Sequence, residues 1–194
     1  MKLLNKRGVL LLKKLKMNLL FSITILLLLA YVVNDALKDN SQEVEKALHS
    51  LNQPISKIIY TKQLDRSQAI VFYESSAGGI ESFGNARFKK TLFGWRLVGA
   101  VSGQNPEGYK LSWSFSNLTF DFSGYTDLIS GKIFDAGIKE VRIVTKNGVE
   151  YSAEIIEHNN NEKYWFLISE GEELLGATIT ALSQDGEIIE QMTK

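Results

Sequence analysis

The spacing of the apolar residues changes at residue 55 and stays changed to the end of the chain. Before this point apolar side chains recur at helical spacing, and after it they alternate with polar ones, which is the period of a β-strand with one buried face. Turn-forming pairs such as Asn147-Gly148 and Asp185-Gly186 divide the alternating part into short pieces. We therefore predict a mainly β domain, built as an antiparallel sandwich or meander.

The alternation also places the individual strands. We expect them at residues 55–62, 68–74, 80–91, 94–101, 109–115, 118–122, 139–145, 149–157, 163–169, 176–182 and 187–190. The apolar positions change phase between Phe115 and Leu118. Because a strand changes its buried face only through an extra residue, we expect a bulge or tight turn at Ser116-Asn117.

A hairpin is predicted in VRIVTKNGVEYSAEI, residues 141–155. A two-residue Asn147-Gly148 turn would put the apolar residues of its two strands on opposite faces of the sheet. A three-residue loop pairs Ile143 with Tyr151 and puts both apolar sets on one face. We expect the three-residue loop, with Gly148 in the left-handed conformation of a bulge.

Residues 17–33 read MNLLFSITILLLLAYVV, a run without a charged side chain. As a helix it would be about 25 Å long at 1.5 Å per residue, slightly less than the ~30 Å hydrocarbon core of a bilayer. Lys16 and Tyr31 at its two ends close this gap. A cleaved signal peptide is the alternative, but no small-x-small cleavage pattern follows the run, which favours a retained anchor.

The charges beside this run predict its orientation. Six basic residues and no acidic one lie within residues 1–33. The positive-inside rule therefore predicts that residues 1–16 are a basic cytoplasmic segment and that residues 17–34 are a single-pass anchor. The remainder would be extracytoplasmic, and the lipid bilayer would be a partner through residues 17–34.

A short juxtamembrane helix is predicted at residues 35–54. Apolar residues recur there at helical spacing from Leu37 to Leu51, and Pro54 ends the segment. Asn40 and Glu43 have the spacing of a capping box at a helix start.

The composition excludes several kinds of protein. There is no cysteine, so disulfides, thiol catalysis and cysteine metal sites are excluded. All 22 acidic side chains but only 16 of the 22 basic ones follow residue 33, which argues against a nucleic-acid partner. The Gly-rich residues 123–137 precede the most acidic part, so we expect a boundary between a β region at 55–125 and an acidic sandwich-like region at 126–194. Residues 147–194 are the expected contact surface.

Motifs for catalysis are missing from the sequence. There is no H-E-x-x-H or G-x-S-x-G pattern, and the two histidines, His49 and His158, lie in separate segments. We predict no catalytic residue, no metal and no cofactor. Glu170, Glu172 and Glu173 form an acidic loop that could ligate Ca²⁺, but their spacing matches no calcium loop. We interpret them as candidate exposed contact residues.

The aromatic residues are mostly interpreted as core, because the alternation directs them inward. Phe93-Gly94-Trp95 is the exception, since it stands at the start of a predicted strand beside a glycine, where one ring can stay exposed. Phe93 and Trp95 are therefore further candidate contact residues.

Two resemblances add to this interpretation. Residues 138–155, followed by KYWFLIS around Trp165 and by GATITALSQDGEII, resemble in pattern an immunoglobulin-like β-sandwich module of the kind common on bacterial surfaces. The whole chain resembles the small, single-pass, uncharacterised envelope proteins of Bacillus-type bacteria. The second resemblance implies a location and no activity.

These observations together predict a membrane-anchored, extracytoplasmic, non-enzymatic binding or interaction protein of the bacterial cell envelope. Its partner would be a protein or a component of the cell wall. Two alternatives remain open. One is a carboxylate-dependent cell-wall hydrolase, which needs two carboxylates about 5–10 Å apart in a cleft. The other is a structural spacer in a membrane complex.

Overall fold

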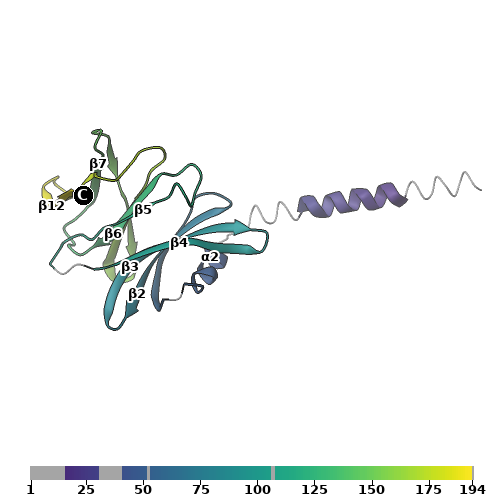
Figure 1. Cartoon of the computed structure of the whole chain (residues 1–194), viewed down its shortest axis with the longest axis horizontal. Coiled ribbons are helices and arrows are strands. Elements are labelled where there is room, and N and C mark those ends of the chain that lie inside the picture. Colours follow the sequence, from purple (N-terminus) through teal and green to yellow (C-terminus); the bar gives the residue numbers. More distant parts are fainter. Residues whose placement is uncertain (1–15, 31–40, 52, 106–107, 194) are drawn as a thin grey trace, which may run out of the picture. The chain divides into compact units, whose positions relative to one another are not determined.

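The computed structural model describes residues 16–30, 41–51, 53–105 and 108–193, and these belong to two units that we describe separately (Figure 1). In the first unit an α-helix covers residues 16–30, and all of its side chains are exposed. Across the described parts of the chain, no helix combines the length and the apolar character that a membrane crossing requires. The predicted anchor extends to residue 34, beyond the described residues, and it stays a prediction.

The second unit contains three antiparallel sheets and a short helix, α2 (Ser41–Leu48). The first sheet is a meander of β1 (Ile55–Gln63), β2 (Gln68–Ala77), β3 (Ile80–Thr91) and β4 (Gly94–Gln104). The second sheet has the order β5 (Ser114–Asn117), β6 (Asp127–Ile133), β10 (Glu162–Ile168) and β9 (Glu154–His158), with a 3₁₀ turn, η1 (Asn159–Asn161), between β9 and β10. The third has the order β12 (Ile188–Thr193), β11 (Thr178–Leu182), β7 (Glu140–Val144) and β8 (Glu150–Ser152).

Three apolar clusters hold these layers together. The first joins α2 to one face of the first sheet, and in Figure 1 the helix lies beside that sheet. The second joins the other face of this sheet to the second sheet, and the third fills the space between the second and third sheets. The order of the layers is therefore α2, first sheet, second sheet, third sheet.

The sequence of β2 explains why its sheet is buried on both faces. Its central residues, AIVFY, are continuously apolar and alternate between the two clusters. Val71 and Tyr73 face α2, whereas Ile70 and Phe72 face the second sheet. In β10, Trp165 similarly points to the third sheet, while Tyr164 and Phe166 point to the first. A continuous apolar run is what a strand covered on both sides requires.

Most predicted strands are confirmed, including all four of the first sheet. The predicted strand at 109–115 is shorter, because regular pairing starts at Ser114 and Leu111 forms only an isolated bridge with Ile133. The predicted strand at 149–157 is interrupted at Ala153, where the chain passes from the third sheet to the second.

The strand predicted at 118–122 is wrong. These residues form a turn in which the Phe122 amide donates to the Leu118 carbonyl at 2.7 Å. Leu118 and Phe122 are buried, while Phe120 between them is 91% exposed. The tight turn expected at Ser116-Asn117 therefore begins only after Asn117, whose side chain accepts a hydrogen bond from the Thr119 amide at 3.1 Å.

Residues 123–137 contain a strand that sequence reasoning missed. β6 pairs with β5 on one side and with β10 on the other. The boundary expected between residues 125 and 126 consequently lies between two paired strands, and the described residues from Ser41 onward form one compact unit. Gly131, one of the glycines of this stretch, is a point of close packing against Ser112 and Trp165.

The three-residue hairpin is confirmed. Ile143 pairs with Tyr151, the Gly148 amide donates to the Thr145 carbonyl at 2.9 Å, and Gly148 has φ +80°. The helix predicted at residues 35–54 ends earlier than expected, because α2 ends at Leu48. Asn40 of the proposed capping box lies outside the described residues.

Candidate functional site

The predicted aromatic contact residues separate in the structure. Phe93 is fully exposed, at 100%, at the tip of the β3–β4 hairpin. Thr91 shapes this tip, since its hydroxyl donates to the Gly94 carbonyl at 2.8 Å and accepts from the Phe93 amide at 3.2 Å. Trp95 instead packs against the cluster between α2 and the first sheet. Its indole Nε1 is enclosed and has no hydrogen-bond partner among the described residues.

The predicted acidic contact residues lie in the loop that follows β10. Within this loop the Ser169 hydroxyl donates to the Glu172 carbonyl at 2.7 Å. The loop is fixed to the start of β6, because Asp127 accepts from the Leu174 amide at 2.8 Å. Glu170 and Glu173 are exposed, and Glu172 is partly buried. Within the described part of the chain, no three His, Asp or Glu side chains come together as metal ligands.

Asp127 is the buried carboxyl that holds this loop. Burial raises its pKa above the ordinary value, and the nearby Glu173 carboxylate raises it further. Hydrogen bonds from the Leu174 and Leu175 amides act in the opposite direction without cancelling the rise. The Asn117 amide group donates to the same side chain at 3.2 Å. Asp127 therefore ties the loop to the end of β5, and its role is structural.

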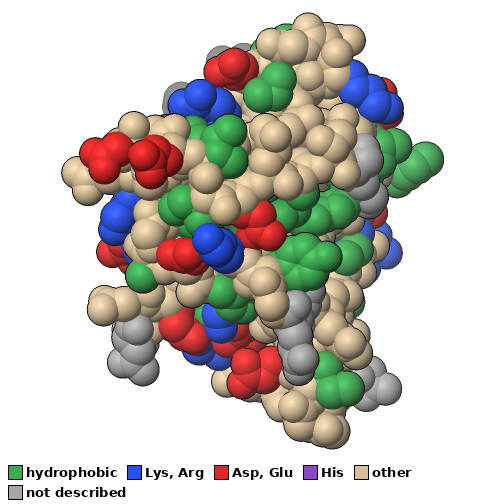
Figure 2. Space-filling model, turned by 90° about the vertical axis from the view of Figure 1, so that its left-hand side faces the viewer, with side chains coloured by type: hydrophobic (Ala, Val, Ile, Leu, Met, Phe, Trp, Pro, Cys, Tyr) green, Lys and Arg blue, Asp and Glu red, His purple; other side chains and the backbone are tan. Residues whose placement is uncertain are grey.

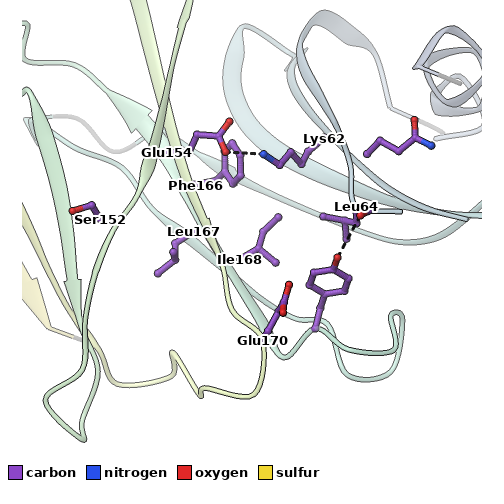
Figure 3. A pocket seen from close by; sticks show the side chains of 10 residues that line it. Lys62, Leu64, Ser152, Glu154, Phe166, Leu167, Ile168 and Glu170 are labelled. Atoms are coloured by element: carbon purple, nitrogen blue, oxygen red, sulfur yellow. Dashed lines mark hydrogen bonds and ion pairs between the residues drawn. The ribbon is translucent and has the colours of Figure 1, made fainter. Parts of the chain in front are cut away.

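A groove of about 330 Å³ lies where the three sheets meet (Figure 3). It is lined by the end of β1, by Tyr125, by residues of β8, β9 and β10, and by one residue of the acidic loop. The lining residues are Lys62, Gln63, Leu64, Tyr125, Ser152, Glu154, Phe166, Leu167, Ile168 and Glu170. Among the predicted contact residues, Glu170 is thus the one that belongs to this groove.

The groove has an apolar floor and a charged rim. Figure 3 shows Lys62 and Glu154 meeting beside the Phe166 ring, with Ile168 between this pair and Glu170. The Lys62 ammonium is 2.8 Å from Glu154 and 5.4 Å from the centre of the Phe166 ring. Glu170 forms no ion pair with any other described residue. The rim therefore has one compensated pair and one uncompensated negative charge.

Tyr125 lines the groove and is near the carboxylates of Glu170 and Asp65. Burial raises the pKa of its hydroxyl, and the carboxylates of Glu170 and Asp65 raise it further. The hydroxyl donates to the Leu64 carbonyl at 3.5 Å. This part of the groove is therefore a place where a positive charge would be favoured.

The acidic composition of residues 147–194 does not produce one acidic surface on the face drawn in Figure 2. Acidic and basic side chains are interspersed there around scattered apolar ones. Sequence composition counts charges along the chain, whereas a binding surface depends on which of them lie together. The local charge of the groove is thus a better guide than the total charge of this part of the chain.

Four charged side chains form a partly buried network between the first and second sheets, in which Glu74 and Lys132 are the more enclosed members. Glu74 of β2 is 2.7 Å from Lys132 of β6 and 3.2 Å from Lys57 of β1. Glu162 of β10 also contacts both lysines, at 3.2 Å for Lys132. The Tyr164 hydroxyl donates to Glu74 at 3.0 Å. The two positive and two negative charges balance.

The protonation states of this network follow from its contacts. Burial alone would raise the pKa of Glu74, but hydrogen bonds from Lys132 and Tyr164 lower it below the ordinary value. The hydrogen bond from Lys57 lowers the pKa of Glu162. Burial would lower the pKa values of both lysines, but their carboxylate partners raise them. All four groups are therefore charged near neutral pH, and none is left as a free acid or base for catalysis.

A second polar cluster anchors the 118–122 turn to the first sheet. Arg87 of β3 is 2.6 Å from Asp121 and 3.3 Å from the Asn85 side-chain oxygen. A side chain at Gly99 would overlap the Arg87 guanidinium, so the glycine makes room for it. Sequence reasoning missed both clusters and most of the groove, because their members come from strands that are distant along the chain.

The network predicts how stability depends on pH. Glu74 and Glu162 have lower pKa values in the folded chain than their ordinary 4.5, so the stability they contribute is present above pH 4.5 and is lost as the pH falls through the folded values. The lysines have pKa values raised above 10.5, so their contribution is present below pH 10.5 and is lost as the pH rises through the folded values. Urea unfolding at a series of pH values should show both losses.

Asp127 provides a control, because its contribution to stability has the opposite dependence on pH. Its raised folded pKa means that its contribution grows as the pH falls from that value toward 3.8. Replacing it (Asp127→Asn) should therefore make the acid loss of stability steeper. A free energy of unfolding that stays constant below pH 4.5 in the Asp127→Asn chain would contradict the ion-pair argument.

Comparisons of the chain with family models, with curated proteins and with solved structures find no match.

Proposed function

We propose that the chain is a membrane-anchored, extracytoplasmic, non-enzymatic binding protein of the bacterial cell envelope. The location is supported by the uncharged apolar run at 17–33 and by the six basic residues within residues 1–33. The binding role is supported by a compact β unit whose groove is open at the junction of its sheets.

The groove is the observation that carries the binding role. Its volume of about 330 Å³ lies at the lower end of the range for binding pockets, which is enough for one or two side chains of a partner. Leu64 and Ile168 offer apolar contact along its length, and Glu170 offers an uncompensated carboxylate. A lysine or arginine side chain matches this combination, because its aliphatic stem packs on apolar surface while its charged end reaches a carboxylate. The proposed partner is a protein with an exposed basic residue.

Hydrolysis of a wall polymer has less support. It would need a carboxylic acid that stays protonated until it donates its proton, beside a second carboxylate. Of the two carboxylates that line the groove, Glu154 is engaged in an ion pair with Lys62. A spacer role gains support from no particular residue.

Site-specific photo-crosslinking in cell membranes tests the groove. A photoreactive residue in place of Ser152, which lines the groove, should give one defined adduct, and the additional change Glu170→Lys should abolish it. The matched control is Glu187→Lys, an exposed glutamate in the turn before β12, which should leave the adduct unchanged. An adduct that survives Glu170→Lys as well as Glu187→Lys would reject the groove as the binding site.

The proposed location has an independent test. A protease added outside intact spheroplasts should digest the β unit and leave a short membrane-bound fragment. N-terminal sequencing of the membrane-associated chain should give residue 1 or 2. A chain that begins near residue 35 would show that the apolar run is a cleaved signal peptide.

A further inference from the structure

The tip of the β3–β4 hairpin exposes two large apolar side chains side by side. Leu92 is 99% exposed and Phe93 is 100% exposed. Gly94, with φ +107°, allows the tight reversal that directs this pair away from the sheet. Single exposed apolar residues are common on protein surfaces, but two adjacent ones at the end of a projecting hairpin form a small apolar wedge without a partner in the unit.

Basic side chains flank this wedge on both strands. Lys89 on β3 pairs directly with Arg96 on β4, so the two cations lie on the same face of the hairpin. Neither forms an ion pair with another described residue. The adjoining β1–β2 turn contacts β3 through the Lys90 amide and the Ser67 carbonyl, and it adds one charge of each sign, Asp65 and Arg66. The end of the hairpin is therefore apolar at its tip and positively charged behind it.

The spacing along the hairpin matches the dimensions of a bilayer surface. Lys89 precedes Leu92 by three residues and Arg96 follows Phe93 by three, which is about 10 Å along a strand. Apolar faces of interfacial proteins enter a bilayer by about 5–10 Å, which leaves cations at this distance among the lipid head groups. We call the flanking cations Lys89 and Arg96 the basic collar of the tip. An apolar tip with such a collar is complementary to an anionic lipid surface.

We propose that Leu92 and Phe93 insert into the outer surface of the membrane, with Lys89 and Arg96 on anionic head groups. This inference rests on the proposed function, because the anchor at 17–34 would keep the β unit beside a bilayer. Six residues, 35–40, separate the proposed anchor from α2 in the sequence. The hairpin thus becomes a second, weaker contact that would orient the groove relative to the membrane.

The absence of cysteine allows a direct test in the full chain. The change Phe93→Cys creates a unique site for an environment-sensitive fluorophore, and Phe120→Cys, at an exposed aromatic residue in the 118–122 turn, is the matched control. Both labelled chains are reconstituted in vesicles of phosphatidylcholine with phosphatidylglycerol, and in vesicles of phosphatidylcholine alone. Emission wavelength, quenching by nitroxide-labelled lipid and quenching by aqueous iodide are then measured.

The label at position 93 should emit at shorter wavelength in anionic vesicles and be quenched by nitroxide lipid, and iodide should quench it several-fold less than the label at position 120. Reversing the collar (Lys89→Glu with Arg96→Glu) should return it to the aqueous phase, whereas reversing the exposed Lys139 (Lys139→Glu) should not. Equal iodide quenching at positions 93 and 120 would overturn the proposal. Protection that depends on protein density rather than on lipid charge would also overturn it, in favour of contact with a second copy.

A carbonate wash separates this proposal from that of the anchor. Chains that remain with the vesicles after the wash support the anchor whatever the label reports. Chains that are released contradict the anchor. The response of the label to added anionic vesicles would still decide whether the tip inserts.

Discussion

Replacing Glu74 with methionine is expected to lower the free energy of unfolding by about 3–5 kcal/mol, the range found when one partner of a buried ion pair is removed. Glu74 accepts hydrogen bonds or ion-pair contacts from Lys57, Lys132 and Tyr164. Without it, Lys132, whose side chain is only 12% exposed, would keep a buried charge with Glu162 as its remaining partner. The loss therefore comes from an uncompensated charge more than from a missing contact.

Urea unfolding followed by tryptophan fluorescence measures this effect. The three tryptophans, Trp95, Trp113 and Trp165, all lie in the β unit, so the signal reports that unit alone even when the full chain is held in detergent. An exposed glutamate replaced in the same way (Glu187→Met) should change the free energy by no more than about 0.5 kcal/mol.

A double replacement tests the stated cause. Adding Lys132→Met to Glu74→Met removes the stranded charge and fills the same space with an apolar side chain. It should restore more than half of the lost stability, because a buried ion pair replaced as a whole is often close to neutral. If the double variant is as unstable as the single one, then packing rather than charge explains the loss.

Replacing Gly131 with alanine is expected to destabilise the β unit by about 3 kcal/mol or more, at the upper end of the range for overpacked cores. A methyl group there would overlap the Ser112 carbonyl and would lie 2.6 Å from Trp165 Nε1. The indole donates to that same Ser112 carbonyl at 3.1 Å, so a shift of either neighbour would also disturb a buried hydrogen bond. A shift of Ser112 and a shift of Trp165 are therefore both unfavourable.

Gly103 provides the matched control for this substitution. It also lies in a strand, β4, but a methyl group there meets no atom within 4 Å. Gly103→Ala should therefore be neutral or slightly stabilising, because alanine restricts the unfolded chain more than glycine does. A similar effect of both substitutions on the urea midpoint would mean that the loss at Gly131 reflects strand propensity and not the close approach of Ser112.

Strands with clear alternation and clear turn residues were predictable from the sequence. The first sheet illustrates this, since each of its strands is long and a turn separates it from the next. The hairpin at Gly148 was predictable for a stricter reason: a loop of the wrong length would have moved every apolar side chain of one strand to the other face.

The failures occurred where tertiary contacts override the local pattern. Leu118, Phe120 and Phe122 alternate like a strand, yet a turn buries the outer two and exposes the middle one. β6 was missed because residues 123–137 are rich in glycine, but Gly131 within it is required by the close approach of the Ser112 backbone rather than by flexibility. The spacing of apolar residues along the chain does not show which distant segment will pack against a given strand or turn.

The candidate site shows the same division. Phe93 was predictable as an exposed ring because it stands beside a glycine at a strand start, and the structure places it at a hairpin tip. Glu170 was singled out as one of three acids, whereas its place in the groove depends on Tyr125 and Leu64, which come from two other segments. No pattern in the sequence connects these three residues.

The sequence by itself determined that the chain has an apolar N-terminal run with basic residues beside it and a mainly β remainder, because both are local periodicities of hydrophobicity. The tertiary structure alone decided the order of the layers, the balanced network around Glu74, and the groove beside Glu170. These depend on contacts between residues such as Glu74 and Lys132, which are 58 positions apart. Such contacts depend on how whole sheets pack together, and they produce no periodic pattern in the sequence.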